Sequence, residues 1–485
     1  MAIDPGLRRL ALGTLLAAFP GRTAPDWAVR LLDEGLAGHT LFGQNIGAAP
    51  QVAELTASLR TGRPDALIAI DEEGGDVTRL AHRTGSPYPG NAALGAVDDP
   101  DLTRSVYAAI GADLAGAGVN LDLAPTVDVN TADDNPVIGT RSFGATPSLV
   151  ARHAGAAITG LQSTGVAACA KHFPGHGATV TDSHLALPIV DVPLDLLRSR
   201  DLPPFAAAIA AGTQAIMTAH IRVPALTGDD PATFSPRALI SLLRAEYSFD
   251  GVIITDALEM KGAAAAAGGI PEASVRAMAA GADLLCIGAD VDEELTLAVA
   301  SALVGAVEDG RLPLSRLEDA ARRTASMAAW AATPRGVASR DADLGFAAAR
   351  RAVRVEGSLA DLASPLVVQL VSGFSIAEGR VPWGLAPHVN GTEQIEVVAA
   401  EASPDELRSR AGARPIVVVG RHTHRSPAGR ALIESLAETH PLAVVEMGWP
   451  SSWRPAHARA FVTTHGSSFA NGRAAAEALG IAARL

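Results

Sequence analysis

The amino-acid sequence predicts an α/β fold: a TIM-like (β/α)8 barrel followed by a smaller α/β layer domain. Two patterns predict the barrel. Eight short apolar runs alternate with helical stretches rich in Ala and Leu, and charged residues directly follow several of these runs. Eight strands alternating with helices close into a parallel barrel, and the working residues of such a barrel lie at the carboxyl ends of its strands.

The predicted barrel strands are short and mainly apolar, and they are Thr14–Phe19, His39–Phe42, Ala66–Ile70, Val119–Ala124, Val166–His172, Ala215–Ala219, Val252–Thr255 and Asp283–Ile287. Helical patterns fill most of the gaps, for example Asp101–Gly116, Leu149–Thr164 and Ile270–Ala280. The apolar run Leu10–Phe19 follows Arg8-Arg9, and it is either the start of a signal peptide or the first strand with its approach. We favour a strand, because the barrel needs it as one of its eight.

The sequence predicts three regions: a catalytic barrel over residues 1–333, a linker and connecting helix over 334–358, and a small α/β sandwich-like domain over 359–485. The barrel is expected to end with the helix Leu314–Trp330, and an Arg-rich helix is expected near Ala347–Arg354. New strands are predicted at Leu366–Val371, Ile395–Ala399, Pro415–Gly420 and Leu442–Met447, and helices at Ala428–Glu438 and Gly472–Leu479. Strands alternating with helices again indicate a layered α/β domain.

The composition of the chain argues against two classes of binding partner. The chain of 485 residues carries a formal net charge of −13 and has a pI near 5.5. Nucleic acid and anionic membranes attract basic faces, so neither is expected as a partner. Cys169 and Cys286 both lie in apolar runs, where we interpret them as core residues. No run is long enough to span a membrane. With the N-terminal run interpreted as a strand, a cytoplasmic location is expected.

The stretch KHFPGHGATVTDSHLALP, residues 171–188, concentrates polar chemistry at the end of the fifth predicted strand. It holds Lys171, His172, His176, Asp182 and His184, and we expect Gly175 and Gly177 to loosen the loop between them. Lys171 is one of only two lysines in the chain, which favours a need for a compact ammonium group there. Loops that mix bases and acids at a strand end usually perform chemistry.

Within this loop, the spacing D-S-H allows Asp182 to fix the tautomer of His184 and to raise its basicity, which suits proton transfer near neutral pH. Asp256, at the end of the seventh predicted strand, is a candidate catalytic carboxylate. Its alternative role is to cap the following helix. Zinc binding by the loop histidines and Asp182 is an alternative for the loop, although the spacing matches no standard motif. Formation of a Schiff base by Lys171 is a further alternative for the chemistry of this loop.

Three further residues follow other predicted strands. Asp71 ends the third strand and Arg79 closes the stretch EEGGDVTR behind it, whereas Arg141 lies in NPVIGTRSFG after the fourth strand. A strand-end aspartate suits bidentate hydrogen bonding to neighbouring hydroxyl groups. Arginines at these positions anchor loops as often as they bind ligands. We predict that all three reach the same barrel mouth.

Taken together, the stretches IDEEGGDVTR, LDLAPTVDVN, NPVIGTRSFG, KHFPGHGATVTDSH and GVIITDALEM resemble glycoside hydrolase family 3, specifically its bacterial β-N-acetylglucosaminidases. The resemblance covers the first two-thirds of the chain. It implies retaining hydrolysis of terminal β-linked N-acetylglucosamine, with Asp256 as the nucleophile and His184, assisted by Asp182, as the acid/base. It also implies sugar binding by Asp71, Arg79, Arg141, Lys171 and His172, and substrates of the chitooligosaccharide or peptidoglycan-fragment type, the latter during peptidoglycan recycling.

A histidine acid is chemically reasonable, because an imidazole starts from a pKa of about 6.5 and repels an incoming phosphate less than a carboxylate does. Phosphorolysis is therefore a variant of the second step, with inorganic phosphate as acceptor. A β-glucosidase or β-xylosidase is a further hypothesis, and a catalytically silent sugar-binding protein is a hypothesis of a different class. We expect no cofactor and no metal. The residues after about 355 are expected to be structural, so that deleting them leaves the chemistry intact. Asp76 departs from the family pattern, since many relatives carry Arg there.

Overall fold

The computed structural model of the chain describes residues 4–183, 186–333, 335 and 341–483. These residues form two compact units, each of which is discontinuous in sequence. The first consists of Met1–Glu72, Thr103–Ile138 and Ala145–Arg340, and the second of Glu73–Leu102, Gly139–Gly144 and Asp341–Leu485. The second unit therefore includes two segments that follow barrel strands in the sequence.

The first unit contains an eight-stranded parallel sheet with the strand order β7-β6-β5-β4-β3-β2-β1-β8. Its strands are β1 (Leu15–Ala17), β2 (Gly38–Leu41), β3 (Leu67–Ile70), β4 (Leu121–Asp122), β5 (Ala167–Phe173), β6 (Ala215–Thr218), β7 (Val252–Thr255) and β8 (Leu285–Cys286). A parallel bridge between Ile254 and Leu284 joins β7 to the β8 segment. The sheet therefore closes on itself, and the predicted barrel is confirmed.

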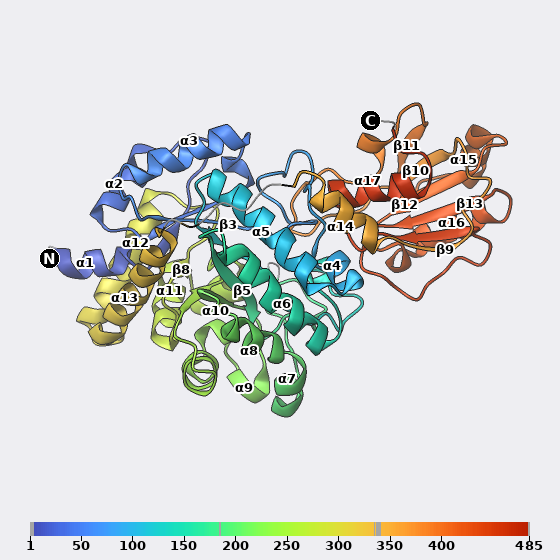
Figure 1. Cartoon of the computed structure of the whole chain (residues 1–485). Helices are drawn as coiled ribbons and strands as arrows, with labels where there is room; N and C mark the ends of the chain where they lie inside the picture. Colours follow the sequence, from blue (N-terminus) through green and yellow to red (C-terminus); the bar gives the residue numbers. More distant parts are fainter. Residues whose placement is uncertain (1–3, 184–185, 334, 336–340, 484–485) are drawn as a thin grey trace. The chain divides into compact units, whose positions relative to one another are not determined.

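Helices surround the strands of this unit (Figure 1). They are α1 (Pro5–Leu12), α2 (Asp26–Glu34), α3 (Ala49–Arg60), α5 (Pro100–Gly116), α6 (Pro147–Gln162), α7 (Leu194–Arg200), α8 (Pro203–Ala210), α9 (Pro224–Thr227), α10 (Lys261–Ala267), α11 (Ile270–Ala280), α12 (Glu293–Glu308) and α13 (Leu314–Ala331). Proline in the first turn starts several of them, including α6 and α11, because its fixed φ suits that position.

One local prediction needs correction. Leu10–Leu12, which we interpreted as the approach to the first strand, belong to helix α1. Asp4 caps this helix by accepting hydrogen bonds from the backbone of Gly6 and Leu7, which a search for apolar runs does not detect. Strand β5 continues to Phe173, one residue past the predicted end, so Lys171 and His172 lie in the strand as predicted. A strand position holds a side chain more rigidly than a loop position does.

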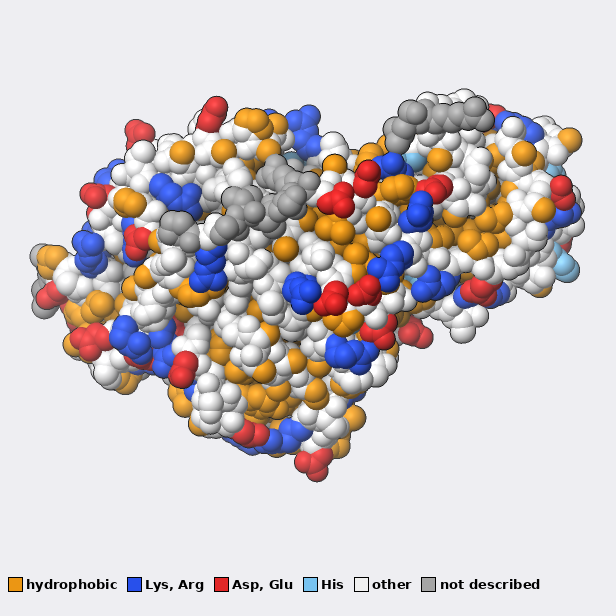
Figure 2. Space-filling view, in the orientation of Figure 1, with side chains coloured by type: hydrophobic (Ala, Val, Ile, Leu, Met, Phe, Trp, Pro, Cys, Tyr) orange, Lys and Arg blue, Asp and Glu red, His pale blue; other side chains and the backbone are white. Residues whose placement is uncertain are grey.

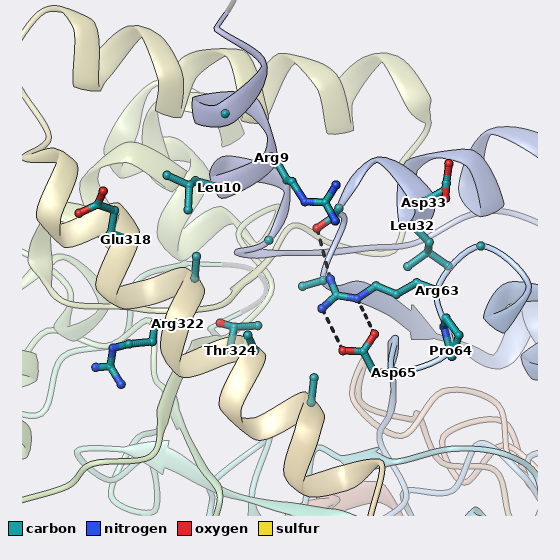
Figure 3. A pocket seen from close by; sticks show the side chains of 18 residues that line it. Arg9, Leu10, Leu32, Asp33, Arg63, Pro64, Asp65, Glu318, Arg322 and Thr324 are labelled. Carbon is teal, nitrogen blue, oxygen red and sulfur yellow. Dashed lines mark hydrogen bonds and ion pairs between the residues drawn. The ribbon is translucent and has the colours of Figure 1, made fainter.

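The end of the barrel where the strands begin holds a pocket of about 690 Å³ (Figure 3). Its wall comes from the residues just before β1, β2 and β3 and from one side of α13. Arg63 links the segment before β3 to the segment before β2. Its guanidinium donates to Asp65 at 2.8 Å and to the carbonyl oxygen of Leu36 at 3.1 Å. The amino ends of barrel strands generally serve stability. Asp71, Lys171, His172 and Asp256 lie at the opposite, carboxyl end of their strands.

The second unit is a mixed sheet between two layers of helices. The strand order is β11-β10-β12-β13-β14-β9, and only β9 runs antiparallel. Its strands are β9 (Arg354–Gly357), β10 (Leu366–Leu370), β11 (Gln394–Val397), β12 (Ile416–Gly420), β13 (Leu442–Glu446) and β14 (Ala460–Thr463). Its helices are α4 (Asn91–Val97), α14 (Leu344–Ala352), α15 (Pro404–Ala411), α16 (Pro427–Ala437) and α17 (Phe469–Ala478).

Alternate residues of each central strand pack on opposite sides of this sheet. Val417 and Val419 contact α17 residues in one cluster, whereas Ile416 and Val418 pack with α15 and α16 in another. The predicted α/β layer domain is therefore confirmed. The predicted helix near Ala347–Arg354 ends at Ala352. Arg354 already belongs to strand β9, where it pairs with Thr463 of β14.

The charge of the chain does not gather in one place on the face shown in Figure 2, where acidic and basic side chains are interspersed. Across the described ranges, no helix is both long enough and apolar enough to cross a bilayer.

Buried histidines make the stability of the fold depend on pH. His39 in β2 is fully buried, and burial lowers its pKa to about 4. The unfolded chain binds a proton on this residue near pH 6.5 and the folded chain does not, so lowering the pH from 7 to 5 favours unfolding by about 2 kcal/mol for this residue.

We expect His39→Gln to remove that contribution, because an amide keeps a donor for the carbonyl oxygen of Ala28 but does not titrate. Urea unfolding at pH 7 and pH 5 measures the effect, and the loss in the variant should be about 2 kcal/mol smaller than in the wild type. An equal loss in both proteins would contradict the assignment.

Candidate active site

A buried ion pair lies at the carboxyl end of the barrel. Asp71 follows β3, and its Oδ1 accepts a hydrogen bond of 2.7 Å from Nζ of Lys171 in β5. The side chain of Lys171 is 2% exposed, so this charge depends on the carboxylate beside it. Asp71 itself remains 19% exposed, which leaves part of its carboxylate accessible to a ligand.

The next residue, His172, is oriented by a second buried carboxylate. Its Nδ1 lies 2.7 Å from Oδ2 of Asp128, which follows β4. Burial raises the pKa of Asp128, but the charge of His172 and the hydrogen bond from its ring outweigh burial, so the pKa of Asp128 lies below its ordinary value. An ionised Asp128 holds the proton of His172 on Nδ1 and so fixes the orientation of the ring.

Asp256 directly follows β7. Its Oδ1 accepts a hydrogen bond of 2.8 Å from the backbone N–H of Ala257. Helix α10 begins at Lys261 with Met260 in the capping position, so Asp256 does not cap that helix. Asp71, Lys171 and Asp256 all lie at or near the carboxyl ends of strands of the same barrel.

The loop after β5 is held more firmly than its glycines suggested. A Cβ atom on Gly177 would lie 2.0 Å from the carbonyl oxygen of Val129, and one on Gly175, at φ +125°, would lie 2.7 Å from Cβ of Asp201. These glycines permit close packing of the backbone, so our expectation that they loosen the loop is wrong. The carbonyl oxygen of Gly177 also accepts a hydrogen bond from Thr131.

Asp182 and His184 lie further along the same loop. Asp182 is half-buried, and its carbonyl oxygen accepts a hydrogen bond from the backbone of Ala186 at 3.1 Å. His184 lies outside the described residues. The pairing of Asp182 with His184 stays a prediction.

Arg141 belongs to the second unit, where it makes a buried bidentate ion pair. Its Nε and Nη2 lie 2.9 and 2.7 Å from the two carboxylate oxygens of Glu73. The two side chains are 5% and 2% exposed. Parallel hydrogen bonds from a planar guanidinium fix its orientation, which lysine could not reproduce.

Arg79 also belongs to the second unit. Its Nη2 donates to the carbonyl oxygen of Ala377 at 2.7 Å, and its Nη1 to that of Glu378 at 3.4 Å. The partner residues lie in the C-terminal third of the sequence. Sugar binding by Arg79 and Arg141 stays a prediction.

Asp76, the departure from the family pattern, has a structural role in the same unit. Its Oδ1 accepts hydrogen bonds from the backbone N–H and the hydroxyl group of Ser467 at 2.8 and 2.7 Å, and its Oδ2 accepts one from Thr140 at 2.6 Å. Arg421 approaches Oδ2 at 3.8 Å. The bonds from Ser467 connect the segment after β3 with the segment after β14. Deleting the residues after 355 would remove Ser467 and Arg421 from Asp76, and Ala377 and Glu378 from Arg79.

Two carboxylates that the sequence patterns did not indicate hold predicted site residues in place. Asp128 orients His172, and Glu73 holds Arg141. Both occur in the stretches that carry the family resemblance, LDLAPTVDVN and IDEEGGDVTR. Asking which carboxylates could pair with the predicted His172 and Arg141 would have directed attention to Asp128 and Glu73. In the part of the chain that the structure describes, no group of three His, Cys, Asp or Glu side chains is arranged to hold a metal ion.

A closed parallel barrel with acidic and basic side chains at the carboxyl ends of its strands has the architecture of a barrel enzyme. Residues 12–327 match the domain described as "Glycosyl hydrolase family 3 N terminal domain". The chain belongs to glycosyl hydrolase family 3, and it is a glycosidase.

Several known proteins are similar to this chain. Beta-hexosaminidase A of Pseudoalteromonas piscicida is 39% identical over 248 residues, which is 47% of this chain but only 42% of that relative's length. A beta-hexosaminidase of Stenotrophomonas maltophilia is 38% identical over 280 residues, 56% of this chain and 81% of that protein. The solved structure of a glycoside hydrolase family 3 β-N-acetylglucosaminidase from Paenibacillus sp. str. FPU-7 has a TM-score of 0.87 and 32% identity, and it covers 99% of this chain and 98% of that chain.

Proposed function

We propose that this glycosidase removes terminal β-linked N-acetylglucosamine with retention of configuration. The observation that carries the proposal is the strand-end arrangement of Asp71, Lys171 and Asp256 in a chain similar to β-N-acetylglucosaminidases. Asp256 attacks the anomeric carbon and forms a covalent glycosyl ester. Water then cleaves the ester, and the configuration is retained after two displacements.

His184, assisted by Asp182, protonates the leaving oxygen in the first step and removes a proton from water in the second. Asp256 has to be ionised when the acid holds its proton. An imidazole meets this requirement near neutral pH without the strong upward pKa shift that a carboxylic acid needs.

The remaining predicted residues bind the sugar. The carboxylate of Asp71 is suited to accept hydrogen bonds from adjacent hydroxyl groups, and Lys171 and His172 supply polar contacts beside it. Lys171 lies 2.7 Å from a carboxylate, which favours its ammonium form. An ammonium group cannot form a Schiff base, so this ion pair supports sugar binding by Lys171 over a covalent role.

The proposed substrates are chitooligosaccharides or peptidoglycan fragments, and a cytoplasmic location and peptidoglycan recycling belong to the same proposal. A panel of nitrophenyl β-glycosides, assayed with and without inorganic phosphate, tests it. We expect the N-acetylglucosaminide to exceed the glucoside and xyloside in kcat/KM. A phosphate-dependent sugar 1-phosphate would identify the phosphorylase alternative. Binding of N-acetylglucosamine without turnover of any glycoside would favour a silent sugar-binding protein.

Mass spectrometry tests the nucleophile. A slow fluorinated N-acetylglucosamine donor should add one sugar to the intact protein, and the peptide that carries the sugar should contain Asp256. Labelling of another carboxylate would contradict the assignment.

A further inference from the structure

We propose that Ser183 is a positioning residue for proton transfer, and that its hydroxyl group anchors the backbone next to Asp182 to the ring of His176. The inference rests on the function proposed above, because Asp182 belongs to the predicted acid/base pair. Ser183 follows Asp182 directly, and its side chain is buried. Its Oγ lies 3.0 Å from Nε2 of His176.

The ring of His176 makes hydrogen bonds at both nitrogens. Nε2 contacts Ser183, and Nδ1 lies 2.7 Å from Oγ1 of Thr179. His176 is completely buried, and burial lowers its pKa to about 4. The ring is therefore neutral at pH 7, so that one nitrogen donates a hydrogen bond and the other accepts one.

The position of the ring proton follows from Thr179. Its Oγ1 also donates to the carbonyl oxygen of His176 at 3.0 Å, and a carbonyl oxygen can only accept. The single hydroxyl proton of Thr179 is used in that bond, so Nδ1 of His176 has to be the donor to Oγ1. Nε2 is then the acceptor, and the hydroxyl group of Ser183 donates to it. The contact is therefore a directed hydrogen bond.

His176 is itself fixed to the barrel loops. Its backbone N–H donates to Oδ1 of Asp128 at 2.6 Å, and its carbonyl oxygen accepts from the side chain of Asn135 at 3.0 Å. Asp128 is also the carboxylate that orients His172. A single buried carboxylate thus supports a predicted sugar-binding residue and the residue to which Ser183 is anchored.

The backbone of Ser183 has a second close neighbour. A Cβ atom on Gly262 would lie 3.2 Å from the carbonyl oxygen of Ser183. Gly262 is near the start of α10, in the segment that follows Asp256. Ser183 therefore contacts the β5 loop through its hydroxyl group, and its carbonyl oxygen lies near the residues that follow the proposed nucleophile.

This arrangement predicts a selective kinetic effect. A proton donor has to lie within hydrogen-bond reach of the leaving oxygen, and losing the anchor would let Asp182, which is proposed to assist the donor, occupy unproductive positions. A neutral hydrogen bond is worth roughly 0.5–1.5 kcal/mol, which corresponds to a rate loss of about two- to tenfold. Only leaving groups that need a proton should show this loss.

Ser183→Ala and Ser183→Thr provide the test with two substrates. Chitobiose has a sugar leaving group that needs protonation, whereas a 2,4-dinitrophenyl leaving group departs as a stable anion. We expect Ser183→Ala to lower kcat/KM about five- to tenfold for chitobiose and less than about twofold for the dinitrophenyl N-acetylglucosaminide. Ser183→Thr keeps the hydroxyl group and should retain most of the activity on both substrates.

Thr179→Val tests the part of the argument that concerns the ring proton. It removes the acceptor of Nδ1, and we expect the same selective loss on chitobiose. Thr181→Val is the matched control, since Thr181 is exposed on the same loop and should leave both rates unchanged.

The outcomes separate the anchor from the proposed function. An equal loss of kcat/KM on both substrates in Ser183→Ala would indicate general damage to the enzyme. That result, or full activity on both substrates, would overturn the proposed role of Ser183 but not the proposed function. A wild-type enzyme that hydrolysed neither N-acetylglucosaminide would overturn the proposed function, and the anchor with it.

Discussion

Asp256→Asn should reduce kcat/KM for a nitrophenyl N-acetylglucosaminide by at least about a thousandfold. The amide keeps the size of the side chain and an oxygen that can accept from the N–H of Ala257. It loses the negative charge and the nucleophilic oxygen that the covalent step requires. Steady-state kinetics measures the loss, and circular dichroism spectra should show an unchanged fold.

Glu259→Gln is the matched control, because Glu259 lies three residues further along the same segment. Its carboxylate accepts hydrogen bonds from the backbone of Ala289 and Asp290. An amide can keep one of these bonds, so we expect activity within about threefold of the wild type. If Asp256→Asn retained more than about a tenth of the activity, another residue would have to be the nucleophile.

Glu73→Ala should destabilise the second unit by about 3–5 kcal/mol. The substitution leaves the buried guanidinium of Arg141 without the carboxylate that meets it at 2.7 and 2.9 Å. Removing one partner of a buried ion pair costs more than the pair contributes as a whole, because the remaining charge stays desolvated. Urea unfolding, followed through the transition of the second unit, measures the loss.

Glu356→Ala in the same unit is the control. Glu356 also forms a bidentate pair, with Arg454 at 2.9 and 2.6 Å, but its side chain is 53% exposed. Water solvates the charges of this pair, so we expect a loss of no more than about 1 kcal/mol. Similar losses in the two variants would show that burial does not determine the strength of the Arg141 pair.

Apolar runs predicted all eight barrel strands because parallel barrel strands are buried on both sides. For β7 the predicted and observed bounds are the same, Val252–Thr255. Strand β9, with the sequence RVEG, was missed because it is exposed along its whole length and has no apolar run. The four-residue strand β14 was missed although all its residues are buried.

The predicted site residues are those with charged or titratable side chains at strand ends, and this rule has a physical limit. It selects the groups that are predicted to contact a ligand but not the groups that hold them in place. Asp128 and Ser183 belong to the second kind, and their roles depend on contacts that only the folded chain creates. The rule also could not assign Arg79 and Arg141 to the second unit, because both follow barrel strands in the sequence.

The membership of residues 73–102 in the second unit has a consequence for biosynthesis. Asp76 and its partner Ser467 are separated by 391 residues. At translation speeds of about 5–20 residues per second, Ser467 is made roughly 20 to 80 s after Asp76. Throughout that interval the nascent chain carries an acidic, glycine-containing segment that lacks Ser467 as a hydrogen-bond partner, although Thr140 has already been synthesised. This part of the protein can therefore complete its folding only near the end of translation.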